Sequence, residues 1–478
     1  MVRVFFIIAF NFLLVTFAAC SENQGPDNNE KPNSSVSDKN LQNAMQIVDN
    51  AISCYFTGSG MSMSRYYNPY TKIRSDEKGS VWMYTASIEA VNAILHGLVA
   101  QKENGNTDVY DENFNRYKDL LEKLYDNADY YAGTYELISY TQTKTWTVYG
   151  VNRGAAKGTA KVEGIENVYD DQMWLIRELL ESYKLTNNAE YLSKAEYLTE
   201  YVLDGWDCTF DVYGQERGGI PWGPGYVTKH SCSNGPMISP LVWLHEIYKD
   251  KDDDITHRYI DPANKLTRKT VQKKKSEYYL EFAEKVYQFQ KKYLLRSDGV
   301  YDDMMGGCSP SKPETETVYG VTYRKGGTCR DRVGPAITYN SGTMLSGASD
   351  LYRATGKSTY FTDAKNLADA SFKYFAKLGE TKDGYYTYNI SGFRNWFNGV
   401  LMRGYMDFYP YYKNVDKYLN SFQMNLDYAF DNFLYENMLP TNLLVGWSYD
   451  NSKNRVEGMF TFAFAAEYAV LSRFELEK

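Results

Sequence analysis

Two residue types that build metal sites are scarce in this sequence, whose 478 residues include only 4 His and 6 Cys. The cysteines lack the paired spacings that bind zinc. The histidines are scattered along the chain, at His96, His230, His245 and His257. We therefore expect no metal site and no other cofactor.

A surplus of positive charge is lacking as well. The net charge is -8, and Lys and Arg are dispersed, whereas nucleic-acid-binding proteins gather them into a patch. This distribution argues against nucleic acid as a partner. Aromatic residues are abundant, with 45 Tyr and 8 Trp. Aromatic rings stack on sugar faces but also fill helical cores, so the composition only leans toward a carbohydrate ligand.

The apolar run from Val4 to Phe17 is too short to span a membrane. It follows a basic start and precedes two alanines and Cys20, which predicts a secretory signal. A cysteine directly after two alanines resembles the lipobox of bacterial lipoproteins, in which the cysteine is lipidated. We expect residues 1–20 to be a lipoprotein signal peptide, and the exported protein to be anchored through Cys20 to the outer membrane, on its periplasmic or surface face. Plain secretion is the alternative.

Residues 21–39 are polar and rich in Asn, Ser and Pro, which predicts a flexible tether. Residues 40–478 are expected to form one domain.

Five cysteines remain after Cys20, and outside the cytoplasm they are free to form disulfides. Cys308 could pair with Cys329, and less readily Cys208 with Cys232. The odd number leaves at least one free thiol.

Apolar residues recur at three- and four-residue steps along most of the chain, which is the period of amphipathic helices. Twelve segments follow this pattern. They cover residues 40–57, 82–103, 112–131, 171–186, 190–204, 235–249, 275–295, 339–355, 359–377, 394–410, 414–433 and 456–473. A motif that begins at Tyr183 recurs at Tyr352. Its second half is repeated more weakly at Tyr279 and Tyr418, and each repeat lies near the start of an odd-numbered segment.

The odd-numbered segments carry charged faces, whereas the even-numbered ones begin with small, polar and aromatic residues. This alternation predicts an all-α fold of six helical hairpins that close into an (α/α)6 toroid, with every inner helix pointing one end at a common site. An open α-solenoid has the same local pattern and remains the alternative.

Three long loops precede inner helices, and long loops in a compact domain are commonly functional. We expect residues 138–168, 205–234 and 297–338 to form the walls of a cleft, the first of them as a β-hairpin. The charged segment 250–274 precedes an outer helix and is predicted to be plain surface.

Two adjacent carboxylates, Asp170 and Asp171, stand at the start of the fourth helical segment. The positive end of the helix dipole favours acids there, and both side chains can reach one cavity at the helix mouth. Hydrolysis of a glycosidic bond requires such a pair of carboxylates. The same tripeptide recurs in a loop as Tyr301-Asp302-Asp303, which is the alternative catalytic pair or an element of the sugar-binding rim.

With these residues assembled, the chain resembles glycoside hydrolase family 76, the endo-α-1,6-mannanases, from about residue 40 to the C-terminus. The motifs that carry the resemblance are Tyr169–Trp174, Gly218–Trp222, Lys229 with Ser233–Pro236, Tyr339–Thr343, and Phe397–Gly399 with Arg403.

The resemblance implies an (α/α)6 barrel and retaining hydrolysis of α-1,6-mannosidic bonds, with Asp170 as the nucleophile and Asp171 as the general acid/base. The acid must keep its proton, and a like-charged neighbour raises its pKa. We expect a monomer whose partner is mannan or an α-1,6-mannooligosaccharide.

Six further residues near the inner-helix mouths are candidate substrate contacts. Four of them have a structural alternative: a loop anchor for the tryptophan in the Gly-rich loop, a helix cap for each asparagine, and an ion pair for the arginine. The six are Trp222, Asn234, Tyr339, Asn340, Trp396 and Arg403.

Two other classes of function fit part of this pattern. One is a surface lipoprotein that binds glycans on a helical scaffold without cleaving them, in which Asp170 and Asp171 are dispensable. The other is a different (α/α)6 enzyme, either a sugar epimerase or an unsaturated uronyl hydrolase. Epimerases of this shape rely on several histidines near the cavity, and uronyl hydrolases on separated acids and basic residues. The adjacent pair favours the mannanase.

Overall fold

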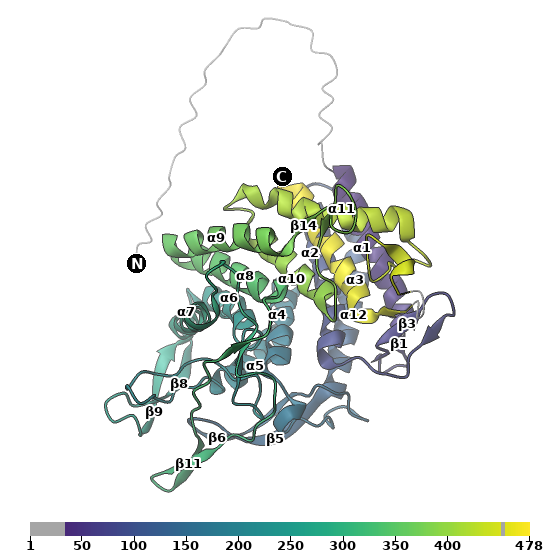
Figure 1. Cartoon of the computed structure of the whole chain (residues 1–478). Coiled ribbons are helices and arrows are strands. Elements are labelled where there is room, and N and C mark those ends of the chain that lie inside the picture. The colour runs from purple at the N-terminus through teal and green to yellow at the C-terminus, as the bar shows by residue number, and fades with distance from the viewer. Residues whose placement is uncertain (1–33, 451–454) are drawn as a thin grey trace, which may run out of the picture.

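Twelve α-helices dominate the residues that the computed structural model describes, 34–450 and 455–478 (Figure 1). They alternate along the chain between an outer and an inner ring. The outer helices are α1 (Ser34–Tyr55), α3 (Thr107–Ala128), α5 (Ala189–Asp204), α7 (Lys275–Leu294), α9 (Ser358–Phe375) and α11 (Asp416–Phe433). The inner helices are α2 (Val81–Glu103), α4 (Tyr169–Thr186), α6 (Ile238–Tyr248), α8 (Thr338–Thr355), α10 (Arg394–Phe408) and α12 (Gly458–Glu477).

The inner helices form a closed ring. Each packs on the next, from α2 through α4, α6, α8 and α10 to α12, which packs back on α2. An open solenoid has two free ends, so this closure excludes it. The predicted (α/α)6 barrel is confirmed.

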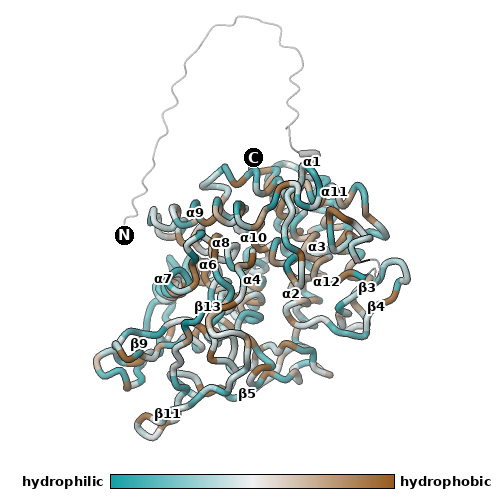
Figure 2. Tube along the Cα trace, in the orientation of Figure 1, coloured by the Kyte–Doolittle hydropathy of each residue, from teal (hydrophilic) through white to brown (hydrophobic). Residues whose placement is uncertain are grey.

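The burial of side chains explains which helices lie inside. Most residues of α2 and nearly all residues of α12 are buried, as expected for helices that are covered on most sides. The outer helix α3 instead buries one stripe, which includes Tyr117, Leu121 and Leu124. Figure 2 shows the hydrophilic colouring that this pattern leaves along outer helices such as α7.

The first helix begins earlier than predicted, so residues 34–39 of the expected tether belong to α1. Hydrogen bonds rather than apolar contacts hold this turn. The Ser37 hydroxyl donates to the Ser472 carbonyl at 2.8 Å, and the Asn40 amide donates to Gln423 at 2.7 Å. A hydropathy pattern does not register such buried polar residues. The signal peptide and Cys20 lie outside the described residues.

Short antiparallel strands fill the loops before the inner helices. Those before α2 are β1 (Phe56–Thr57), β2 (Ser62–Met63), β3 (Tyr66–Asn68) and β4 (Ile73–Arg74), and β16 (Val456–Glu457) pairs with β3. The hairpin before α4 consists of β5 (Ala132–Ile138) and β6 (Thr143–Tyr149), with Ala132 opposite Tyr149. A hairpin was expected there, but it begins six residues earlier than predicted and leaves residues 150–168 largely irregular. The strands before α10 are β14 (Lys377–Leu378) and β15 (Tyr386–Thr387).

A three-stranded sheet joins the two other long loops. Its strands are β7 (Lys229–His230), β10 (Met304–Met305) and β13 (Arg332–Val333), in the order β13-β10-β7. The second of these loops also carries the hairpin of β11 (Thr315–Val318) and β12 (Val321–Arg324). Two loops far apart in sequence therefore form one wall.

Residues 250–274 lie mostly at the surface, as predicted, but they also form a regular hairpin that the sequence did not indicate. They form the hairpin of β8 (Asp254–Ile260) and β9 (Arg268–Lys274), whose base leads into α7. At its far end, Arg268 donates to the Tyr140 carbonyl at 3.1 Å and pairs with Glu316 at 2.9 Å. The hairpins β5–β6, β8–β9 and β11–β12 thus gather at one side of the helices, away from the C-terminus (Figure 1).

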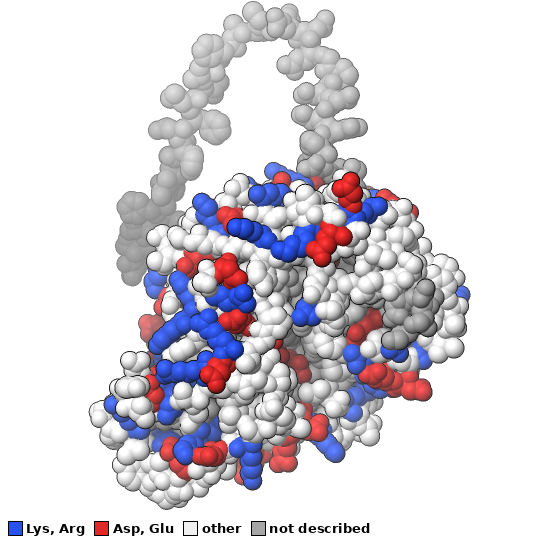
Figure 3. All heavy atoms as spheres, viewed as in Figure 1, with Lys and Arg blue, Asp and Glu red and all other residues white. Residues whose placement is uncertain are grey.

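The remaining sequence-based expectations concern cysteines, charge and membrane spans. The five cysteines within the described ranges are free, so neither Cys308–Cys329 nor Cys208–Cys232 forms a disulfide. Basic and acidic side chains are interspersed over the face seen in Figure 3. Among the described helices, none combines the length and apolar character needed to cross a bilayer.

Candidate active site

The adjacent carboxylates occupy the first turn of α4, whose start is fixed from two sides. The Tyr169 amide donates to the Trp222 carbonyl at 2.8 Å, so the second long loop supplies the helix with a main-chain acceptor. The side chain of Gln172 holds strand β6, because it accepts from the Tyr149 amide at 3.1 Å and donates to the Tyr149 carbonyl at 2.7 Å. Asp170 and Asp171 therefore stand on a rigid element, near its positive end.

The two carboxyls have different acidities. Burial raises the pKa of Asp170 to about 6, although the nearby Cys232 thiol and Trp222 indole lower it in part. Burial and the charge of Asp170 raise the pKa of Asp171 further, well above its usual range. Asp171 is therefore the weaker acid of the pair and keeps its proton to higher pH than Asp170. The Oδ1 atom of Asp170 is enclosed and has no hydrogen-bond partner among the described residues.

An aromatic floor lies beside the pair. The Trp174 indole donates to the Tyr339 hydroxyl at 2.8 Å, and the ring centroids of Trp174 and Trp396 are 4.7 Å apart. Burial raises the pKa of Tyr339, and the charges of Cys232, Asp170 and Asp171 raise it further, which places this phenol close to the carboxylates. The predicted residues Tyr339 and Trp396 thus belong to the site, as its buried floor.

Arg403, which was predicted as a substrate contact, is engaged by other protein groups. It forms an ion pair with Glu89, which also accepts from the Trp396 indole at 3.0 Å. The guanidinium carbon lies 5.2 Å from the centroid of the Trp174 ring. The guanidinium of Arg403 therefore holds Glu89 and packs on Trp174. An ion pair was the structural alternative that the sequence suggested for this arginine.

Trp222 is held as a platform. Its ring stacks on His230, with centroids 4.7 Å apart and an interplanar angle of 23°. Burial lowers the pKa of His230 to about 4, so the imidazole is neutral, and its Nε2 atom lies 3.0 Å from both the Thr228 hydroxyl and the Gly307 carbonyl. The sequence left His230 unassigned, and the structure makes it the support of Trp222.

Asn234 is buried, and its amide is already used. It accepts from the Ile220 amide at 2.9 Å and donates to the carbonyls of Ile220 and His230 at 3.0 and 2.8 Å. Lys229 likewise contacts Asp207 at 2.8 Å. These residues shape the loop that carries Trp222, so the expected sugar contact at Asn234 is replaced by a positioning role.

A third carboxylate reaches the site from the repeated Tyr-Asp-Asp motif. The Asn340 amide donates to the Asp302 carbonyl at 3.2 Å and lies 3.5 Å from Asp303 Oδ1. Asp170 and Asp303 both help to raise the pKa of Cys232, after burial, so this thiol lies among the acids of both motifs. Asn340 thus joins the site by orienting Asp303. The recurrence of the tripeptide before an inner helix was the signal in the sequence.

The site offers nothing that would hold a metal ion. Across residues 34–450 and 455–478, no group of three or more His, Cys, Asp and Glu side chains is arranged as a metal site. The arrangement brings together two carboxyls of different acidity, a partly exposed tryptophan ring and a third acid.

The model of glycosyl hydrolase family 76 matches residues 159–268 and 255–425, which together make up more than half of the chain. The chain belongs to this family. Membership of family 76 makes it a glycoside hydrolase.

Solved structures of family 76 share the fold at low sequence identity. The family 76 mannosidase Bt3792 from Bacteroides thetaiotaomicron is 21% identical, with a TM-score of 0.65 over 92% of this chain and 99% of that chain. An inactive variant of the α-1,6-mannanase GH76A of Salegentibacter sp. HEL1_6, in complex with α-1,6-mannotriose, is 20% identical, with a TM-score of 0.56 over 91% and 99%.

The fold alone does not decide the reaction. A D-mannose isomerase is 10% identical, with a TM-score of 0.55 over 91% of this chain and 97% of that chain. No curated protein matches the sequence. The family match and the carboxylates of α4 therefore carry the assignment to the hydrolases.

Proposed function

We propose that this family 76 hydrolase cleaves α-1,6-mannosidic bonds of mannan with retention of configuration, through Asp170 as the nucleophile and Asp171 as the general acid/base. The observation that carries the proposal is the pair of adjacent buried carboxyls whose acidities the site drives apart. The mannotriose complex of the Salegentibacter mannanase, which was made inactive by replacing two adjacent aspartates, supports the choice of substrate and residues.

The first step divides the work between the two acids. The ionised Asp170 attacks the anomeric carbon as Asp171 passes its proton to the leaving glycosidic oxygen, and a glycosyl ester forms on Asp170. In the second step Asp171, now a carboxylate, removes a proton from water, which attacks the anomeric carbon and releases Asp170. Two displacements on the same carbon restore the α configuration.

The surrounding residues bind and orient the sugar. Trp222 offers a ring of partial exposure whose position His230 fixes, which suits the apolar face of a mannose. Asp303, held by Asn340, can accept hydrogen bonds from sugar hydroxyls. Trp174, Tyr339 and Trp396 close the floor, and Asn234 and Arg403 position these groups from behind.

The function is tested by digestion of linear α-1,6-mannan with the purified protein. We expect shorter α-1,6-mannooligosaccharides, and proton NMR at early times should show the α-anomer at the new reducing ends. The sizes of the products separate internal cleavage from release at chain ends. A protein that binds the oligosaccharides without cutting them would instead be a glycan-binding scaffold, and a β-anomer formed first would exclude retention.

The acidities predict the dependence of the reaction on pH. Asp170 must be ionised, so kcat/KM should fall about tenfold per pH unit below about 6, two units above the usual range of an aspartate. Asp171 must be protonated, so activity should be lost at a higher pH. The two pKa values describe the coupled pair of acids and not each acid alone. They are measured from a bell-shaped plot of kcat/KM against pH.

The control for this profile is Asp171→Asn, assayed on an aryl mannoside whose leaving group needs no proton. Its acid limb should remain near pH 6 and its alkaline limb should vanish. An acid limb near pH 4 in the wild type would contradict the assignment of Asp170.

A further inference from the structure

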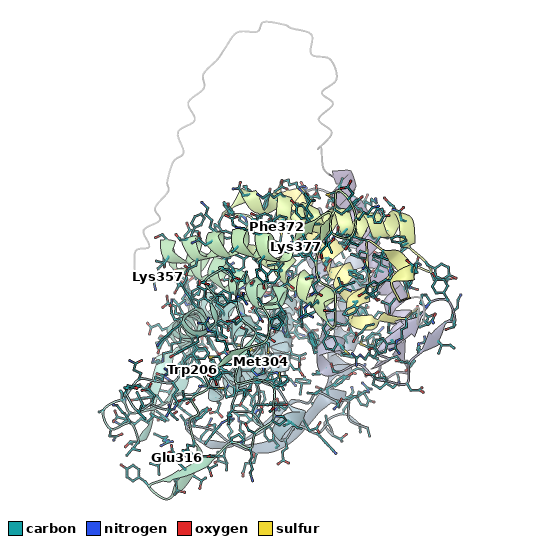
Figure 4. The ribbon with its side chains drawn as sticks, viewed as in Figure 1. Trp206, Met304, Glu316, Lys357, Phe372 and Lys377 are labelled. Carbon is teal, nitrogen blue, oxygen red and sulfur yellow. The ribbon has the colours of Figure 1, made fainter. Side chains whose placement is uncertain are left out.

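A cavity of about 220 Å³ lies outside the catalytic site, between helices α5 and α7 and the β8–β9 hairpin. At roughly 30 Å³ per water molecule it has room for about seven waters, enough for one sugar ring. Trp206 lines it, and Figure 4 shows this residue between the helices and the hairpin of β11 that Glu316 marks. The loop that begins at Trp206 is the loop that carries Trp222 to the catalytic site.

Aromatic rings dominate the lining of the cavity. They come from three separate elements: the loop after α5, strand β8 and the first turns of α7. The six rings belong to Trp206, Phe210, His257, Tyr259, Tyr278 and Phe282. The imidazole of His257 packs 5.4 Å from Tyr278 and 5.7 Å from Phe282, measured between ring centroids. Several aromatic faces around one small space suit a ligand with an apolar face.

Two polar atoms of residues that line the cavity lack hydrogen-bond partners. Asp204 accepts at Oδ1 from the Ser139 hydroxyl at 2.9 Å and from Gln142 at 3.0 Å. Its Oδ2 atom and the Nδ1 atom of His257 are enclosed, and the described part of the chain supplies neither with a hydrogen bond. An unpaired carboxylate oxygen and ring nitrogen in the wall of a cavity are suited to hydrogen bonds with the hydroxyl groups of a ligand.

The charges favour a neutral ligand. Glu200 is paired with Lys144 at 2.7 Å, and Glu216 lies 3.9 Å from Lys285 and accepts from the Trp206 indole. Burial lowers the pKa of His257 to about 4, so its ring is uncharged near neutral pH. A cationic ligand would be repelled by Lys285, and the acids Glu200 and Glu216 are already paired with lysines. An anionic ligand would be repelled by Asp204. Hydroxyl donors and an apolar face together describe a sugar.

We propose that this cavity is a second carbohydrate-binding site, which holds one neutral hexose unit at a distance from the reacting bond. The site rests on the proposed function for the identity of its ligand, a mannose unit of the same polysaccharide. The β8–β9 hairpin, which forms one wall, gives this chain a pocket that the barrel helices alone do not make. Occupancy would retain a polymer near the cleaving carboxylates and would matter little for short substrates.

The test is ligand-observed NMR with methyl α-mannoside and methyl α-glucoside, on the full protein with both catalytic aspartates changed to asparagine. Phe210→Ala and Tyr259→Ala each remove one partly exposed ring of the cavity. The matched control is Tyr213→Ala, which removes a ring that is 82% exposed on the same loop and does not line the cavity. We expect at least tenfold weaker binding at one site in both cavity variants and no change in the control.

The same three substitutions in the otherwise wild-type protein give the second readout. The cavity variants should raise the KM for polymeric α-1,6-mannan several-fold, with cleavage of α-1,6-mannotriose unchanged. The proposal is overturned if the cavity variants bind the monosaccharides as tightly as the parent protein. It is also overturned if neither monosaccharide binds. Loss of binding in the cavity variants of a protein that never cleaves mannan would support the sugar site and reject the proposed function, so the two failures are distinguishable.

Discussion

Asp170→Asn and Asp171→Asn are each expected to lower kcat/KM on α-1,6-mannan by about 10⁴-fold or more, as removal of one member of a cooperating catalytic group does. Each replacement keeps the shape of the side chain and removes either the attacking oxygen or the transferable proton. The measurement is the initial rate of reducing-end release, with circular dichroism to verify the fold. Residual activity within tenfold of the wild type in either variant would reject the pair.

The same substitutions should stabilise the fold at neutral pH. A carboxyl whose pKa is higher in the folded than in the unfolded chain stabilises fully below its unfolded value near 4, and loses this contribution as the pH rises through the folded value. At pH 7 the ionised Asp170 therefore costs about 3 kcal/mol of stability, which the amide avoids. Burial raises the pKa of Asp171 in the same direction, so its amide avoids a cost of the same sign. Thermal unfolding should show higher midpoints for both variants at pH 7 and little difference at pH 4.

Alanine variants at the same positions assign the two roles. With an aryl mannoside and azide, Asp171→Ala still forms the glycosyl ester, which azide attacks to give the α-mannosyl azide. In Asp170→Ala, azide replaces the nucleophile itself and gives the β-mannosyl azide. The opposite pattern would exchange the assignments of Asp170 and Asp171.

Of the substitutions proposed for this protein, Gly342→Ala is expected to lower the stability of the fold the most. A Cβ atom at Gly342 would lie 2.6 Å from the Val400 carbonyl oxygen and 2.7 Å from the Leu401 nitrogen, so α8 and α10 could not keep their spacing. Overpacking of this kind costs about 1–3 kcal/mol or more. Because Tyr339 and Asn340 precede Gly342 by one turn or less, activity should fall with stability. Thermal unfolding and kcat/KM are the measurements.

Gly97→Ala is the matched control for this prediction. It also lies inside an inner helix, but the one close contact of its Cβ would be the end of the Leu41 side chain, at 2.8 Å, whereas the nearest backbone atom would be the Ala469 oxygen at 3.7 Å, an ordinary contact. We expect a midpoint within a degree or two of the wild type. Equal losses in the two variants would show that packing between the helix backbones is not the cause.

Periodicity was sufficient to predict the helices of this protein, because each must present an apolar stripe or a fully apolar surface to the barrel. Elements held by polar contacts were harder to predict. The first turn of α1 depends on Ser37 and Asn40, and the β8–β9 hairpin has a charged, exposed strand and depends on contacts such as Arg268 with Glu316. In neither segment do apolar residues recur with the regular spacing of a helix or strand that has one buried face.

For the site, the sequence indicated Asp170 and Asp171 because they are neighbours at a helix start. It could not assign Asp303, whose approach to Cys232 depends on the sheet that joins two distant loops. It also could not separate Arg403 from the substrate contacts, because an arginine on an inner helix can face either the cavity or the barrel axis. Only the position of Glu89 decides between them.

The hydrogen bond from the Tyr169 amide to the Trp222 carbonyl separates two properties that a single residue would otherwise couple. The main chain of Trp222 sets the position of helix α4, and its side chain is the proposed platform for the sugar. The ring can therefore be exchanged for another without moving the acids of α4. A substitution of Trp222 can therefore change the preference for a particular sugar or branch while Asp170 and Asp171 keep their positions.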